Sequence, residues 1–144
     1  MSTEIRKPRF NHVAMSVPAD LLGETGRREL CDFYGEVFGW NELPTETVDG
    51  RKLVFGVHAI EQFVFLIADE SPMVAPRLDH FGLSVGTEAE LDDVLAKAKA
   101  YQARDDRVDV IDKQLEDHGM LAITSIYVGY LLPMMVEIQY WDFK

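Results

Sequence analysis

The chain is poor in cysteine and in basic residues, and it has no long hydrophobic run. Its single cysteine, Cys31, cannot form an internal disulfide and lies in a helical pattern, so we interpret it as a buried reduced thiol. No apolar stretch approaches the roughly 20 residues that a membrane-spanning helix needs, and the first residues lack the apolar core of a secretory signal. We therefore expect a soluble, cytoplasmic protein that does not associate with membranes.

Acidic residues outnumber basic ones by 25 to 14, which gives a formal net charge of −11. Such a charge repels nucleic-acid phosphates and anionic membrane surfaces at long range, so nucleic acid is not an expected partner. The length of 144 residues is typical of one domain, and a hydrophobic content of 47% excludes a disordered chain. We therefore expect one compact folded domain.

Two short segments of the chain repeat each other. NHVAMSV, which contains His12, and DHFGLSV, which contains His80, both alternate in the manner of a strand. The histidine, the serine and the last valine recur at a constant offset of 68 residues. This correspondence indicates an internal duplication.

The residues after each repeated strand predict the same elements in both halves. A helix in RRELCDFYGEVFGW is expected to end at Gly39, and a second helix begins at a capping box formed by Thr87 and Glu90. Extended segments follow: a short strand near residues 46–48, KLVFGVHA and QFVFLIAD in the first half, and RVDVI, LAITSIYV and MMVEIQYW in the second. Two β-α-β-β-β modules, residues 9–70 and 78–144, are therefore predicted, with residues 71–77 as a proline-containing linker.

The predicted fold class is α+β, with the two modules pairing into a curved mixed sheet that encloses a cleft. In each module the helix covers the sheet face that carries the larger apolar side chains. His12 and His80 then lie on the other face, where small neighbours such as Ala14 and Gly82 leave space for a ligand.

Glu137 lies inside the apolar run MMVEIQYW, where an unpaired buried carboxylate would cost roughly several kcal/mol. Each residue taken alone has an ordinary explanation, since strand histidines usually form hydrogen bonds and Glu137 could face water. Two histidines at matched positions and one carboxylate are, however, the ligands of a divalent-metal site with open coordination positions. We therefore predict that His12, His80 and Glu137 hold a catalytic metal ion.

The segments NHVAMSV, DFYGEVFGW, DHFGLSV and VEIQYW resemble the vicinal oxygen chelate superfamily of glyoxalases, bleomycin-resistance proteins and extradiol dioxygenases, over nearly the whole chain. In that superfamily the first and last strands of a module supply metal ligands, which implies His12, His80 and Glu137. The first module has no matching acid, because Val64 or a neighbour aligns with Glu137 when the last strands of the two modules are compared. Whether Gln62 is a fourth ligand stays open. A site with three protein ligands resembles those of extradiol dioxygenases, hydroxyphenylpyruvate-type dioxygenases and fosfomycin thiol transferases. Glyoxalase I and methylmalonyl-CoA epimerase typically use four.

The spacing of His118, Tyr127 and Glu137 is similar to the extradiol signature. Carried over, His118 and Tyr127 would be catalytic residues that orient a catecholate, and Fe(II) would be the favoured ion. The turn after Tyr130 departs from the signature, and the further acid-base histidine of extradiol enzymes has no counterpart.

Several alternatives remain open at this stage. Zn, Mn, Ni or Co suit the same ligands and would favour a glyoxalase-like isomerase or lyase, or a thiol transferase. A metal-free protein that binds a small molecule such as an antibiotic in an aromatic cleft is a different class. Members of the superfamily commonly pair or exchange modules, so the resemblance also implies a homodimer.

Overall fold

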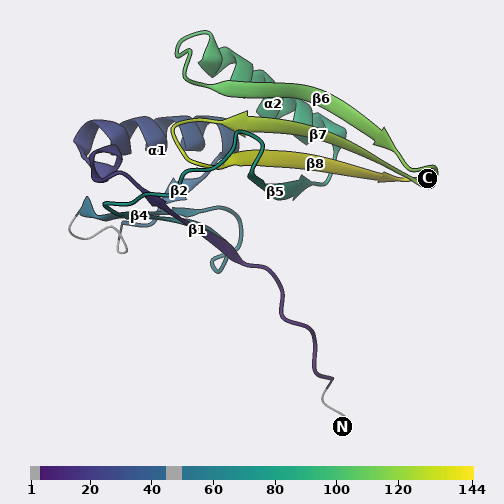
Figure 1. Ribbon diagram of the computed structural model, residues 1–144. Helices are drawn as coiled ribbons and strands as arrows, with labels where there is room; N and C mark the ends of the chain where they lie inside the picture. The colour runs from purple at the N-terminus through teal and green to yellow at the C-terminus, as the bar shows by residue number, and fades with distance from the viewer. Residues whose placement is uncertain (1–3, 45–49) are drawn as a thin grey trace.

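The computed structural model describes residues 4–44 and 50–144 and shows two α+β modules in sequence (Figure 1). The first module contains β1 (His12–Val17), the short 3-10 helix η1 (Ala19–Leu22), α1 (Glu24–Phe38), β2 (Asn41–Glu42), β3 (Lys52–Gly56) and β4 (Phe63–Ala68). The second contains β5 (His80–Val85), α2 (Glu88–Gln102), β6 (Asp109–Asp117), β7 (Leu121–Gly129) and β8 (Met135–Phe143). The predicted α+β class is confirmed, whereas the strand expected near residues 46–48 lies outside the described residues.

Each module has one four-stranded mixed sheet. The strand order is β1-β4-β3-β2 in the first and β5-β8-β7-β6 in the second, and the pairs β1–β4 and β5–β8 are parallel. The two sheets are separate in the described part of the chain, because no strand ladder joins them. β1 and β5 are consequently edge strands.

The register of the sheets extends the duplication to the last strand of each module. Ala14 of β1 pairs with Phe65 of β4, and its counterpart Gly82 of β5 pairs with Glu137 of β8. Phe65, the neighbour of Val64, therefore occupies the position in the first module that Glu137 occupies in the second.

α1 ends and α2 begins where the sequence predicts. Gly39 adopts the left-handed conformation, with φ of 74°, and its N–H donates to the carbonyls of Tyr34 and Gly35 at the end of α1. The Thr87 side chain accepts a hydrogen bond from the Glu90 N–H at the start of α2. No helix among the described residues is long and apolar enough to cross a membrane.

Aromatic side chains join the two modules on the helix side. α1 packs against α2, and Phe33 of α1 stacks on Tyr130, with ring centroids 4.4 Å apart. The hydroxyl of Tyr34 donates to the Tyr130 carbonyl over 2.9 Å. This junction is part of one continuous hydrophobic core, whereas His12 and His80 lie on the opposite, exposed faces of their sheets.

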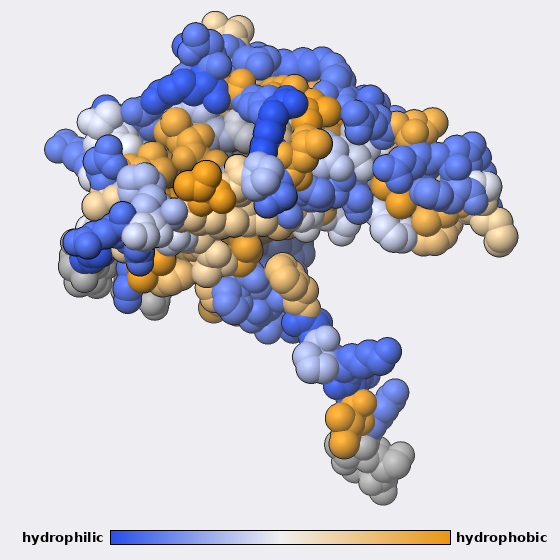
Figure 2. All heavy atoms as spheres, viewed as in Figure 1, coloured by the Kyte–Doolittle hydropathy of each residue, from blue (hydrophilic) through white to orange (hydrophobic). Residues whose placement is uncertain are grey.

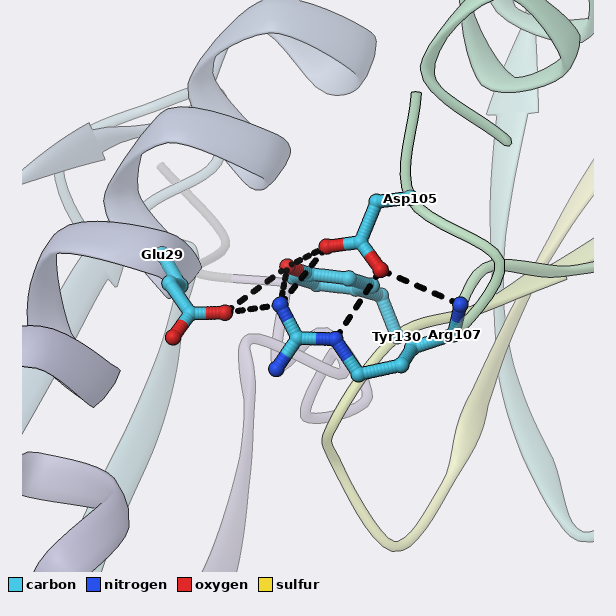
Figure 3. Close-up of polar contacts among 4 residues, drawn as sticks. All are labelled: Glu29, Asp105, Arg107 and Tyr130. Carbon is cyan, nitrogen blue, oxygen red and sulfur yellow. Dashed lines mark hydrogen bonds and ion pairs between the residues drawn. The ribbon is translucent and has the colours of Figure 1, made fainter. Parts of the chain in front are cut away.

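A polar cluster reinforces the same junction (Figure 3). The buried Tyr130 hydroxyl donates to Asp105 over 2.7 Å and accepts from Arg107 over 3.0 Å. Arg107 also forms ion pairs with Asp105 and with Glu29 of α1. Hydrogen bonds from Arg107 and Tyr130 hold the pKa of Asp105 well below its usual range. Since only Glu29 belongs to the first module, the cluster adds a polar contact between the two modules.

Candidate metal site

His80 and Glu137 approach each other on the open face of the second sheet. The distance from His80 Nε2 to Glu137 Oε1 is 3.6 Å, and Glu137 is only 6% exposed. Gly82, opposite Glu137 in the ladder, leaves space beside the carboxylate, because a Cβ at that position would lie 3.4 Å from Oε1. The pair predicted from the sequence is thus brought together by β5 and β8.

The surroundings of His80 determine which ring nitrogen can bind a ligand. Its Nδ1 lies 2.8 Å from the carbonyl oxygen of Leu78, which can only accept, so Nδ1 carries the proton. In the neutral ring Nε2 then holds a lone pair and faces another lone-pair group, the carboxylate of Glu137. A cation between the two groups would accept a lone pair from each. The 3.6 Å between Nε2 and Oε1 is a separation typical of two ligand atoms that each lie about 2.1 Å from one ion. His80 and Glu137 therefore fit a divalent metal.

Tyr127 completes this part of the site. It pairs with Glu137 across the β7–β8 ladder, and its ring meets the His80 ring edge-on with centroids 5.0 Å apart. Hydrogen bonding to the Glu137 carboxylate, followed by burial, raises the pKa of Tyr127 to about 12. At neutral pH the hydroxyl is consequently protonated and can act as a hydrogen-bond donor.

His12 is oriented in the same way but is apart from the pair. Its Nδ1 lies 2.6 Å from Asn11 Oδ1, and its ring stacks on Phe63 with centroids 4.6 Å apart, so Nε2 is again the nitrogen available for a metal. Among residues 4–44 and 50–144, no group of three or more His, Cys, Asp or Glu side chains is placed to hold an ion. One chain therefore supplies His80 and Glu137 together, and His12 separately.

His118 and Gln62 are also apart from His80 and Glu137. The exposed His118 lies in the β6–β7 turn, where its Nε2 is 3.4 Å from Glu116. From Leu121, next to this turn, six residues of β7 lead to Tyr127, which corresponds to about 20 Å. Gln62 Oε1 accepts a hydrogen bond from the Ala59 N–H over 3.0 Å in the first module.

Sequence reasoning predicted a cleft but missed the groups that orient the histidines. The groups that orient the histidines, Asn11 and the Leu78 carbonyl, precede their histidines by one and two residues, and only Asn11 carries a side-chain signal. A cavity of about 500 Å³ also lies at the junction of the modules, bordered by His12, Ser84 and the rings of Phe38, Trp40 and Phe81. Its volume and apolar lining are typical of small-molecule sites.

Solved structures share this fold, although the sequence matches no family model and no curated protein. A Bacillus anthracis protein described as glyoxalase-family has 20% identity over 99% of this chain and 100% of its own, with a TM-score of 0.62. Fosfomycin resistance protein FosX from Listeria monocytogenes has 15% identity over 94% of both chains and a TM-score of 0.64. Lactoylglutathione lyase from Agrobacterium tumefaciens has 17% identity over 93% of this chain and 94% of its own, with a TM-score of 0.62. The chain therefore shares the fold of these glyoxalase-family and fosfomycin resistance structures.

Proposed function

We propose that the protein is a divalent-metal-dependent enzyme whose small substrate presents two neighbouring oxygens to the ion. The observation that carries the proposal is the His80–Glu137 pair, in which two lone-pair groups face each other across 3.6 Å. The Leu78 carbonyl fixes the required tautomer of His80. Such a pair leaves coordination positions open for further ligands and substrate.

The third protein ligand is His12 of a second copy of the chain. Both repeat-related histidines expose Nε2, but the module junction of one chain keeps His12 apart from His80 and Glu137. β1 and β5 are also open edges, and Val13, Phe81 and Leu83 on their helix side are only partly buried. Unpaired edges of this kind are suited to association. A symmetric homodimer would contain two such sites, each with His12 from one copy and His80 and Glu137 from the other.

The substrate class rests on the chemistry of the ligands and on the shared fold. A FosX structure that is 15% identical, with a TM-score of 0.64, is described as a complex with Mn(II) and 1S,2S-dihydroxypropylphosphonic acid, which carries two adjacent hydroxyls. It makes Mn(II) and a vicinal diol reasonable first probes. When bound, the ion would act as a Lewis acid and as a template for two substrate oxygens.

The residues of this chain have separate roles in that site. His80 and Glu137 hold the ion, and the Gly82 position keeps the space beside Glu137 open. Tyr127, which keeps its proton at neutral pH, donates a hydrogen bond to Glu137 or to a substrate oxygen. The cavity beside His12 provides an apolar wall for the rest of the substrate.

Among metal-dependent reactions of such substrates, the first candidate is glyoxalase-type isomerase, lyase or transferase chemistry, which needs no residue beyond the ligands and Tyr127. Fe(II)-dependent ring cleavage is the second candidate, and the contact of Tyr127 with Glu137 favours it. It also requires His118, which would have to reach the site from elsewhere in a dimer. His118→Ala should then abolish turnover of a catechol while metal content is unchanged; full turnover would remove the dioxygenase hypothesis.

The proposal is tested by metal content, measured by elemental mass spectrometry on protein purified without a metal-affinity tag and reconstituted with Mn(II) or, anaerobically, Fe(II). Wild type should bind about one ion per chain, and Glu137→Ala should lower the affinity by about 100-fold or more. Glu116→Ala, which removes an exposed carboxylate of the same module, is the control and should bind normally. A wild-type protein that binds no divalent ion contradicts the proposal and favours a metal-free binding protein.

A further inference from the structure

The segment before β1 is an extended arm (residues 4–10) that leaves the body of the protein (Figure 1). All seven residues are exposed, including Ile5 at 94% and Phe10 at 77%. In the described part of the chain, the backbone of the arm forms no hydrogen bond, and Arg9 forms an ion pair with Glu61. The arm thus presents apolar side chains and unpaired backbone groups to solvent.

The second module has an open strand edge with complementary properties. β5 ends at Val85, opposite Tyr140, whereas β8 continues with Trp141, Asp142 and Phe143, which pair only with β7. The Lys144 N–H donates to the Met120 carbonyl, so the backbone groups of Lys144 point toward β7. In an antiparallel ladder the backbone groups of successive residues point alternately toward and away from the partner strand. The backbone groups of Trp141 and Phe143 therefore point away from β7, along the free edge.

The side chains at this edge are apolar and acidic. Phe143 is 72% exposed and Trp141 is 45% exposed, and Asp142 lies between them. Figure 2 shows exposed hydrophobic atoms both on this end of the sheet and on the arm. The arm carries Arg6, Lys7 and Arg9 against one acidic residue, Glu4, so its charge is opposite to that of Asp142 and of the strongly acidic chain as a whole.

We propose that the arm of one copy adds as an antiparallel strand to the free edge of β8 in a second copy. This inference rests on the pairing of two copies proposed above. One register pairs side chains of complementary character along both segments: Ile5 opposite Phe143, Arg6 opposite Asp142 and Lys7 opposite Trp141. These are an apolar pair, an ion pair and a cation–π pair, the contacts that stabilise neighbouring strands.

Proline in the arm agrees with this register. With Ile5 and Lys7 bonded to β8, the backbone of Pro8 faces outward, where its missing N–H costs no ladder hydrogen bond. Proline at that position also prevents a further strand from adding to the arm. Exchange of both arms between the same two copies closes the assembly as a symmetric dimer. Seven extended residues span about 23 Å, which is enough to cross from β1 to a neighbouring chain.

The first test is hydrogen exchange of the backbone amides of the full chain, measured above and below the dissociation constant of the dimer. The amides of Ile5 and Lys7 should exchange at least about tenfold more slowly in the dimer only. Slow exchange at both concentrations indicates contact within one chain and overturns the proposal. Fast exchange in a confirmed dimer overturns the arm contact alone and leaves the shared metal site intact.

The second test is the dissociation constant, measured by sedimentation equilibrium. Deletion of residues 4–9 should weaken the dimer by about tenfold, as expected from three cross-strand pairs. Arg6→Glu should weaken it by about threefold and Asp142→Arg should restore it in the double variant. Lys97→Glu, an equal charge change on the exposed face of α2, is the control and should have no effect. An unchanged constant after deletion refutes the arm contact, and a monomer at all concentrations refutes both this contact and the shared metal site. Metal binding is not a readout in either test, so failure of the metal proposal is recognised separately.

Discussion

The two modules share one topology but differ at the position of Glu137, a ligand of the proposed metal site. In the second module β8 places Glu137 beside His80, whereas in the first module the matched residue next to His12 is Phe65. Both histidines have Nδ1 bound to an oxygen, which leaves Nε2 as the nitrogen available for a metal. The duplication has therefore left the second module with two of the proposed ligands and the first with one. The proposed site needs ligands from both modules, and one chain does not group these ligands.

The absence of an acid in the first module can be reversed by a single substitution. Phe65→Glu places a carboxylate opposite Ala14, in the register that Glu137 has with Gly82. In the shared site it would act as a fourth ligand and strengthen Mn(II) binding by about tenfold. Calorimetric titration checks this, with Phe65→Gln as a control for the size and polarity of the new side chain. Unchanged affinity for Mn(II) would show that Phe65 does not lie at the site.

The junction between the modules is expected to contribute to stability and only indirectly to the metal site. Tyr130→Phe removes the hydroxyl that bonds to Asp105 and Arg107, and the free energy of unfolding should fall by about 1–2 kcal/mol. Denaturant unfolding measures this, and Tyr101→Phe, whose ring also lies at the junction, is the matched control. Metal affinity should change little in either variant. A large loss of metal binding in Tyr130→Phe would mean that the modules reorient and that their arrangement is set by this cluster.

Local features of the fold were predictable from the sequence. The left-handed Gly39 and the Thr87 cap end and begin helices through groups that are at most a few residues apart. The strand pattern around His12 and His80 likewise depends on alternation alone. These signals predicted the helices and strands of both modules, whereas the prediction of His80 and Glu137 in one site together with His12 came from the repeat and the family resemblance.

Long-range features were not predictable in the same way. The Phe33–Tyr130 stack joins residues that are far apart in the chain, and no pattern in either segment specifies the other. This contact holds the modules together through their helices and keeps the two sheets separate. A repeat shows that two half-sites exist, but it does not show which copy of the chain brings them together. The alignment also located the first-module counterpart of Glu137 only approximately, and the ladder assigns it to Phe65.

The most direct test of the shared site is complementation between two inactive variants. His12→Ala and Glu137→Ala each destroy every site in their own homodimers. Mixed by partial unfolding and refolding, they form heterodimers in which one of two sites keeps His12 from one chain and His80 and Glu137 from the other. The account predicts that Mn(II) binding returns to about one quarter of the wild-type amount, because about half of the dimers are mixed. Metal binding that stays absent in a verified heterodimer, or a His12→Ala variant that binds Mn(II) as well as wild type, would contradict it.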